Sequence, residues 1–131
     1  MSEREIALAA AGLEAWRRGD FSRVESLLDE RATWRWWEPG EWNCASRDDI
    51  LRTLRERHEQ GFGRGEVELV DGGPGAVIVV SRPSEIGGDE WPAEAATVLS
   101  FAGEKIVAMQ DYRTREEALA AVGGPKGVAD R

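Results

Sequence analysis

The order of two hydrophobic periodicities along the chain constrains its fold most strongly. In the first half, apolar residues recur at the three- and four-residue spacing of amphipathic helices, whereas the second half alternates over short segments separated by glycine-rich turns. Helices followed by a run of hairpin-connected strands indicate an α+β domain with an antiparallel sheet. The expected division is a single domain over residues 1–122 and a flexible tail over residues 123–131.

Residues that favour helix starts and tight turns predict where these elements begin and end. Ser and Thr residues followed three positions later by an acidic residue match N-terminal helix caps, and Asp20, directly after Gly19, can cap the second helix. Gly-Gly-Pro-Gly at 72–75 matches a turn. The expected helices cover residues 2–19, 20–28, 46–61 and 114–122, and the expected strands cover residues 32–38, 66–71, 76–82, 92–102 and 105–113.

The last predicted hairpin places one acidic residue, Asp111, on an apolar strand face. A two-residue turn at Gly103–Glu104 places Ala96 opposite Asp111, and Asp111 then continues the apolar strand face that carries Met109. Burying a carboxylate is costly, and burial raises its pKa into a range that suits proton transfer near neutrality. Asp111 is therefore a candidate general acid or base.

A structural interpretation of Asp111 stays open beside the catalytic one. In it, the carboxylate forms an ion pair with an arginine such as Arg35 or Arg113 at the rim of the sheet. The stability of an Asp111→Asn variant separates the two, because neutralising a strained functional acid should not destabilise the fold.

Four of the six tryptophans fall between Trp34 and Trp42. In a strand, Trp34, Trp36 and Glu38 share one face and Trp37 takes the other. These rings could line the mouth of a pocket for a flat apolar ligand, or they could form the core and a dimer interface. Trp36 is the strongest pocket candidate.

Charge and composition exclude several classes of function. Seventeen basic residues against 25 acidic ones give a net charge of −8, which disfavours nucleic acids and anionic membranes as partners. One cysteine, Cys44, and one histidine, His58, leave no disulfide and no Cys- or His-rich metal site. We expect neither a metal nor an organic cofactor, and the charged start without a signal sequence favours a cytoplasmic protein.

Five short motifs in this order and spacing resemble one family. They are Trp16…Gly19-Asp20-Phe21, Ala32-Thr33-Trp34, Glu38-Pro39-Gly40, Ser46-Arg47-Asp48-Asp49-Ile50 and Lys105–Tyr112. Together they resemble SnoaL-like members of the nuclear transport factor 2-like superfamily. The resemblance implies a cone-shaped barrel in which a strongly curved antiparallel sheet wraps around the N-terminal helices and leaves an internal apolar pocket. It also implies a homodimer.

The resemblance covers enzymes as well as proteins that only bind partners. Relatives include polyketide cyclases, ketosteroid isomerases, limonene-epoxide hydrolases and scytalone dehydratases. Asp111 occupies the position of the water-activating aspartate of the epoxide hydrolases, and Glu38 lies near the base of the isomerases. The Arg-x-Asp pair of the hydrolases is missing, since the comparable stretch reads Val80-Ser81-Arg82-Pro83. The tyrosine of the isomerases is also missing from the first helix.

Two functions from different classes are therefore expected. The first is a cofactor-independent isomerase, cyclase, hydratase or dehydratase that acts on a small, largely apolar, cyclic molecule. The second is a non-catalytic ligand-binding or dimerisation module of the same fold. Asp111 and Glu38 are the candidate catalytic residues, and the candidate ligand-binding residues are Trp16, Trp34, Trp36, His58, Met109 and Tyr112. The alternative to ligand binding for His58 is a structural role, in which the partly buried imidazole packs on the apolar helix face with its hydrogen bonds satisfied.

Overall fold

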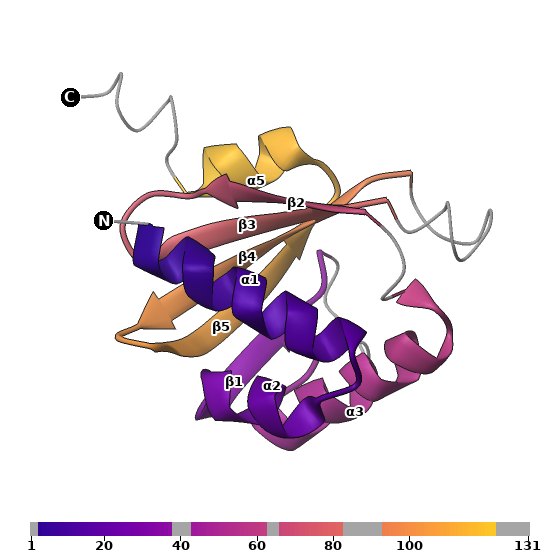
Figure 1. The fold of residues 1–131 in the computed structure, drawn as a ribbon. Helices are drawn as coiled ribbons and strands as arrows, with labels where there is room; N and C mark the ends of the chain where they lie inside the picture. The colour runs from indigo at the N-terminus through magenta and orange to yellow at the C-terminus, as the bar shows by residue number, and fades with distance from the viewer. Residues whose placement is uncertain (1–2, 38–42, 63–65, 83–92, 123–131) are drawn as a thin grey trace.

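The computed structural model describes residues 3–37, 43–62, 66–82 and 93–122. Glu38, Trp42 and the tail expected at 123–131 lie outside these residues. The elements in chain order are α1 (Glu3–Arg17), α2 (Phe21–Leu27), β1 (Leu28–Arg35), α3 (Arg47–Glu59), β2 (Val67–Asp71), β3 (Ala76–Ser81), β4 (Ala95–Ala102), β5 (Lys105–Tyr112) and α5 (Arg115–Ala121) (Figure 1).

The expected helix caps within the described residues are confirmed. Asp20, Ser46 and Thr114 each accept a hydrogen bond from a backbone N–H three residues further on, which satisfies a donor that the first turn leaves unpaired. The second helix is shorter than expected, because Leu28 already has extended backbone geometry and begins β1.

The five strands form one sheet in the order β1-β5-β4-β3-β2. Strands β2 to β5 pair antiparallel with their neighbours, as expected of segments joined by short turns. Strand β1 instead pairs parallel with β5, so the sheet is mixed rather than wholly antiparallel. Strand β1 has no hairpin partner in sequence. The chain between β1 and β5 contains α3 and three strands, so it is long enough for the crossover that parallel pairing requires.

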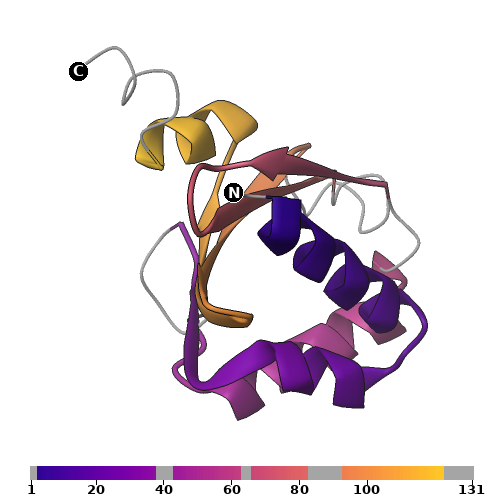
Figure 2. The ribbon, with the colours of Figure 1, turned by 60° about the vertical axis from the view of Figure 1, so that its left-hand side comes forward.

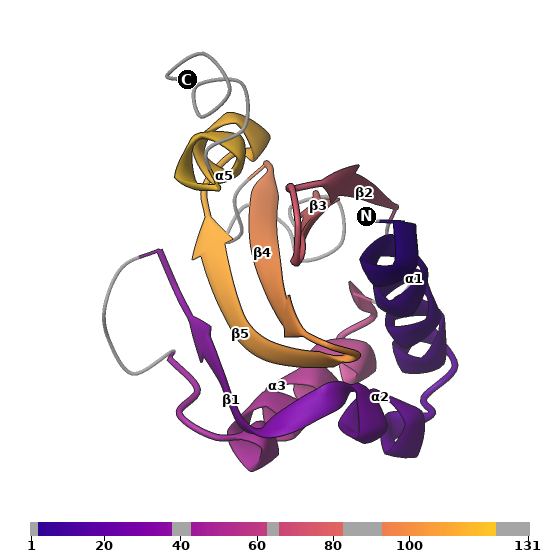
Figure 3. The ribbon, with the colours of Figure 1, turned by 90° about the vertical axis from the view of Figure 1, so that its left-hand side faces the viewer.

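The sheet is strongly curved, does not close, and has helices on both faces. Figures 2 and 3 show α1, α2 and α3 on its concave side and α5 on its convex side. Two clusters of buried residues follow from this arrangement. The larger cluster joins the three N-terminal helices to the concave face, and the smaller one joins α5 to the convex face. The expected α+β cone is therefore confirmed.

The β4–β5 hairpin contains an irregularity that the sequence analysis missed. Ala102 pairs with Lys105, as expected, but the register shifts between Ser100 and Phe101. A bulge places one extra residue on β5 at this point, which sharpens the bend of the sheet. As a consequence, Asp111 lies opposite Thr97 and not opposite Ala96.

Candidate functional site

A cavity of about 200 Å³ lies between the N-terminal helices and the concave face of the sheet. Residues from α1, α2, α3 and all five strands line it, and most of their side chains are apolar. The larger apolar members of the lining are Leu13, Trp16, Leu27, Leu28, Trp34, Trp36, Trp37, Leu54, Phe62, Leu99, Ile106 and Met109. The internal pocket that the resemblance implied is thus present as a space in this fold.

Asp111 brings a carboxyl group into this apolar lining from β5. It is 4% exposed and is the one charged side chain among the buried residues that the structure describes. Its Oδ1 atom accepts a hydrogen bond from the Trp34 indole N–H at 2.8 Å and another from the Thr97 hydroxyl at 2.7 Å. Both donors use the same oxygen, so Oδ2 is the atom left to meet a molecule in the cavity.

Burial has the largest effect on the pKa of this group. Loss of hydration raises the pKa of Asp111 above its ordinary value, while the hydrogen bonds from Thr97 and Trp34 and the positive charge of Arg57 lower it by less. The carboxyl is therefore easier to protonate than one in water. A carboxyl with a raised pKa is closer than an ordinary one to the range in which an acid–base catalyst works.

Arg57, from α3, is a charged residue of the cavity that the sequence analysis did not select. It is half-buried and lines the cavity, and its Cζ atom lies 4.8 Å from the centre of the Trp34 ring. Burial lowers the pKa of Arg57, and the nearby Asp111 opposes that effect. Its position was readable from the spacing of Ile50, Leu54 and Arg57, which places the arginine at the end of an apolar helix stripe.

The arginines expected beside Asp111 are elsewhere. Arg35 and Arg113 are both exposed, and neither lines the cavity. The cation whose charge reaches Asp111 is Arg57. Neither arginine of the structural interpretation lies beside Asp111, and Arg57, 54 positions away in a helix, acts on the carboxyl through its charge and not through an ion pair within 4.0 Å.

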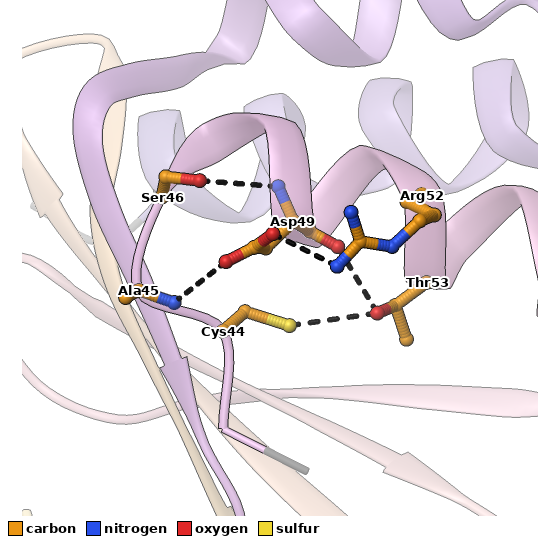
Figure 4. Close-up of polar contacts among 6 residues, drawn as sticks. All are labelled: Cys44, Ala45, Ser46, Asp49, Arg52 and Thr53. Carbon is orange, nitrogen blue, oxygen red and sulfur yellow. Dashed lines mark hydrogen bonds and ion pairs between the residues drawn. The ribbon is translucent and has the colours of Figure 1, made fainter. Parts of the chain in front are cut away.

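Contacts at the start of α3 place this helix against β1 and so place Arg57 over Trp34. Cys44 exchanges two backbone hydrogen bonds with Trp34, with N···O distances of 2.9 and 2.7 Å. Two residues later, Ser46 caps the helix through the N–H of Asp49 (Figure 4). Further contacts of this corner join Ala45 to Asp49, Arg52 to Asp49 and Cys44 to Thr53.

The tryptophans after β1 both belong to the cavity lining. Trp36 and Trp37 stack with ring centres 4.0 Å apart and an angle of 29° between the ring planes. The expectation that Trp37 faces away from Trp36 is wrong, because β1 ends at Arg35 and the alternation of a strand ends with it. Hydrogen bonds from the Trp36 N–H to Asn43 and from Gln110 to the Trp36 carbonyl oxygen hold this segment.

The remaining candidate residues divide into two groups. Trp16 and Met109 line the cavity, whereas His58 and Tyr112 do not. His58 packs edge-on against Trp16 and Phe21, and its Nε2 atom lies 3.2 Å from a carbonyl oxygen of α1. This arrangement matches the packing role that the sequence left open for His58. Tyr112 packs with the cluster on the convex face, under α5.

Within the described ranges, no three His, Cys, Asp or Glu residues gather as metal ligands would. Over the same residues, none of the helices combines the length and the apolar character needed to cross a membrane.

Comparison with known proteins supplies the family. The sequence profile of the SnoaL-like domain matches residues 9–109, which is more than half of the chain. The chain belongs to the SnoaL-like domain family. Among curated proteins, none matches this SnoaL-like domain.

Solved structures of low sequence identity share the fold of this SnoaL-like domain. An NTF-2-like protein of unknown function from Burkholderia xenovorans LB400 has a TM-score of 0.66 at 22% identity, over 86% of this chain and 84% of that one. Bal32a, from a soil-derived mobile gene cassette, has a TM-score of 0.63 at 20% identity, over 89% of this chain and 94% of that one. A third structure is a protein with a ketosteroid isomerase-like fold from Catenulispora acidiphila DSM 44928, in complex with trimethylamine. It has a TM-score of 0.54 at 20% identity, over 92% of this chain and 95% of that one.

Proposed function

We propose that this SnoaL-like domain binds a small, largely apolar, cyclic molecule in its cavity, and that Asp111 exchanges a proton with that molecule without a cofactor. One observation carries the proposal. The buried carboxyl of Asp111 lines an otherwise apolar, tryptophan-rich cavity, with Oδ1 held by two donors and Oδ2 available to a ligand. A carboxyl oxygen held in place within an apolar pocket suits proton-transfer catalysis.

The size of the cavity limits the ligand. An engineered apolar cavity of about 150 Å³ in another protein is known to bind benzene, so a space of about 200 Å³ suits a molecule somewhat larger than benzene. A four-ring skeleton exceeds it. The proposed substrate is therefore a one-ring compound, or a compact two-ring compound, rather than a steroid or a tetracyclic polyketide.

The proposed reaction class follows from the carboxyl group. As a base, the Asp111 carboxylate takes a proton from carbon or from a water molecule. As an acid, the protonated group returns one to carbon or to a leaving oxygen, and an isomerisation, cyclisation, hydration or dehydration can be assembled from these two steps. Trp34 and Thr97 are the positioning residues, because they hold Oδ1 and so fix where Oδ2 points. Glu38 stays a predicted second acid, outside the described residues.

A non-catalytic binding module is the alternative function, and one observation favours it. Asp111 already has two hydrogen-bond donors and a nearby cation within the protein, which is also how a purely structural acid is accommodated. In this alternative the cavity binds the same class of molecule and performs no chemistry on it.

Tryptophan fluorescence tests binding first. Single-ring probes such as indane and cyclohexanone, with a steroid as the oversized control, are titrated into the wild type and into Trp36→Phe. We expect saturable quenching by the small probes, weaker quenching in the variant, and no response to the steroid. Absence of saturation with every small probe would contradict the proposed binding function.

Exchange of ligand protons for deuterium tests catalysis. Incorporation of deuterium from D₂O into cyclohexanone next to its carbonyl is followed by NMR with the wild type, Asp111→Asn and the exposed-site control Asp48→Asn. We expect acceleration by the wild type and by the control, and its loss in Asp111→Asn. Binding without acceleration in the wild type would favour the non-catalytic alternative.

A homodimer and a cytoplasmic location belong to the proposal as well. Both rest on the resemblance and the composition. Light scattering on the purified chain tests the dimer, for which we expect about twice the 14.5 kDa of one chain.

A further inference from the structure

Arg57 introduces a cation into a cavity that is otherwise mostly apolar. The chain as a whole carries a net charge of −8, so the positive charge is a local feature of this site. Arg82 also lines the cavity but is exposed, as is the acidic Glu66. Among the described lining residues, Arg57 is thus the cation that is partly withdrawn from water, and contacts such as the one with Trp34 must replace its lost hydration.

Two contacts define how the Arg57 guanidinium is presented. Its Cζ atom lies over the Trp34 ring at 4.8 Å, and such stacking limits how the guanidinium plane can move. The positive charge of Arg57 lowers the pKa of Asp111. Asp111 nevertheless takes part in none of the ion pairs within 4.0 Å that the described residues make. The carboxyl of Asp111 uses Oδ1 for Trp34 and Thr97 instead. The two charged groups therefore flank the cavity without neutralising each other in direct contact.

We propose that Arg57 anchors a carboxylate group of the ligand, so that the substrate class is small cyclic carboxylic acids. The inference rests on the proposed function and narrows its substrate. A guanidinium presents five N–H donors in a planar fork that matches a carboxylate, and two of them are enough for a bidentate contact alongside its contacts within the protein. The ring of such a ligand then lies against the apolar lining, within reach of Oδ2 of Asp111.

The preference for an acid over its neutral analogue tests this assignment. Benzoate and benzamide have the same size and shape and differ in charge. Their affinities are measured by calorimetry at pH 7 with the wild type, Arg57→Gln and Arg57→Lys. Arg55→Gln is the matched control, because Arg55 lies on the same helix, stacks over Phe21 at 5.2 Å and does not line the cavity.

We expect benzoate to bind the wild type at least tenfold more tightly than benzamide. In Arg57→Gln that ratio should fall to about one, with benzamide affinity kept within threefold. Arg57→Lys should keep part of the preference, since it retains the charge and loses the fork. The Arg55→Gln control should behave as the wild type.

Distinct results overturn the inference and the proposed function. Equal affinities of benzoate and benzamide in the wild type would overturn the carboxylate assignment and leave the binding function standing. A preference that survives in a folded Arg57→Gln would overturn the role of Arg57. If neither probe binds and the neutral single-ring probes also fail, both proposals are wrong. If Arg57→Gln does not fold, the wild-type ratio together with Arg57→Lys decides the assignment.

Discussion

Trp34 donates its indole N–H to Oδ1 of Asp111 at 2.8 Å, although 77 positions separate the two residues in sequence. The face of the same ring carries the guanidinium of Arg57 at 4.8 Å. The Trp34 side chain thus contacts two charged groups of the cavity: its indole N–H binds Asp111, and the face of its ring packs against Arg57. A substitution at Trp34 should consequently disturb the acid and the cation together.

Asp111→Asn should change how stability depends on pH. Burial raises the folded-state pKa above the ordinary value of 3.8, so the folded state binds this proton more tightly than the unfolded chain does. The contribution of Asp111 to the free energy of unfolding is then complete below about pH 4 and is lost as the pH rises through the folded pKa. Urea unfolding at intervals from about pH 4 to pH 8 measures the difference between wild type and variant.

Over that interval the wild type should lose stability relative to Asp111→Asn. At neutral pH the variant should be at least as stable as the wild type. A wild type that gains stability relative to the variant as the pH rises would reveal a structural ion pair instead.

Thr97→Val should raise the pKa of Asp111 further. The hydroxyl of Thr97 stabilises the charged carboxylate through a 2.7 Å hydrogen bond, and valine keeps the shape while removing the donor. We expect a loss of about 1 kcal/mol of stability at neutral pH, the usual size of one hydrogen bond. Titration of the carboxyl carbon by NMR gives the pKa, and Thr97→Ser, which keeps the hydroxyl, should leave it close to the wild-type value.

His58→Ala should weaken the fold without weakening ligand binding. The imidazole contacts a carbonyl oxygen of Arg17 and packs on Trp16 and Phe21, outside the cavity lining. Losing one hydrogen bond and this ring packing should cost about 1–2 kcal/mol. Thermal unfolding and a probe titration are run side by side. A tenfold loss of probe affinity at unchanged stability would contradict this prediction and indicate that His58 contributes to ligand binding.

Gly12→Ala should stabilise α1 and shrink the cavity. An added Cβ would lie 3.0 Å from Cδ1 of Leu27, a flexible side-chain end that itself lines the cavity and has room to move into it. Alanine in a helix interior is favoured over glycine by about 1 kcal/mol. Denaturant unfolding should show most of this gain, together with weaker binding of single-ring probes. Destabilisation would mean that the Leu27 side chain cannot move away from the added Cβ.

Local chemistry made much of the fold predictable. Caps such as Ser46 and Thr114 act through a hydrogen bond three residues away, so the sequence around them contains the whole interaction. Asp111 was also recognisable, because period-two alternation with Met109 survives in β5 beyond the irregular pairing. An acidic residue on an apolar strand face can be recognised from the sequence of its own strand, without knowing which strand pairs with it.

Features that depend on distant segments were not predictable in the same way. The spacing from Ile50 and Leu54 places Arg57 on the inner face of α3, but its contact with Trp34 depends on how α3 is placed across β1. Trp37 turns inward because β1 stops at Arg35, and the point where a strand ends is poorly encoded by its own residues. The parallel pairing of β1 with β5 likewise reflects which sheet edge was vacant.

The bulge in the last hairpin has a consequence for how relatives of this chain diverge. It inserts a residue into β5 near Ile106 and thereby determines that Asp111 lies opposite a threonine rather than an alanine. Deleting that one residue would remove the bulge and still leave Asp111 opposite Thr97, because the shortened strand then follows the regular register of the hairpin. Among homologues, a strand shorter by this residue should therefore keep the hydroxyl beside the carboxyl and differ in how sharply the sheet bends around the cavity.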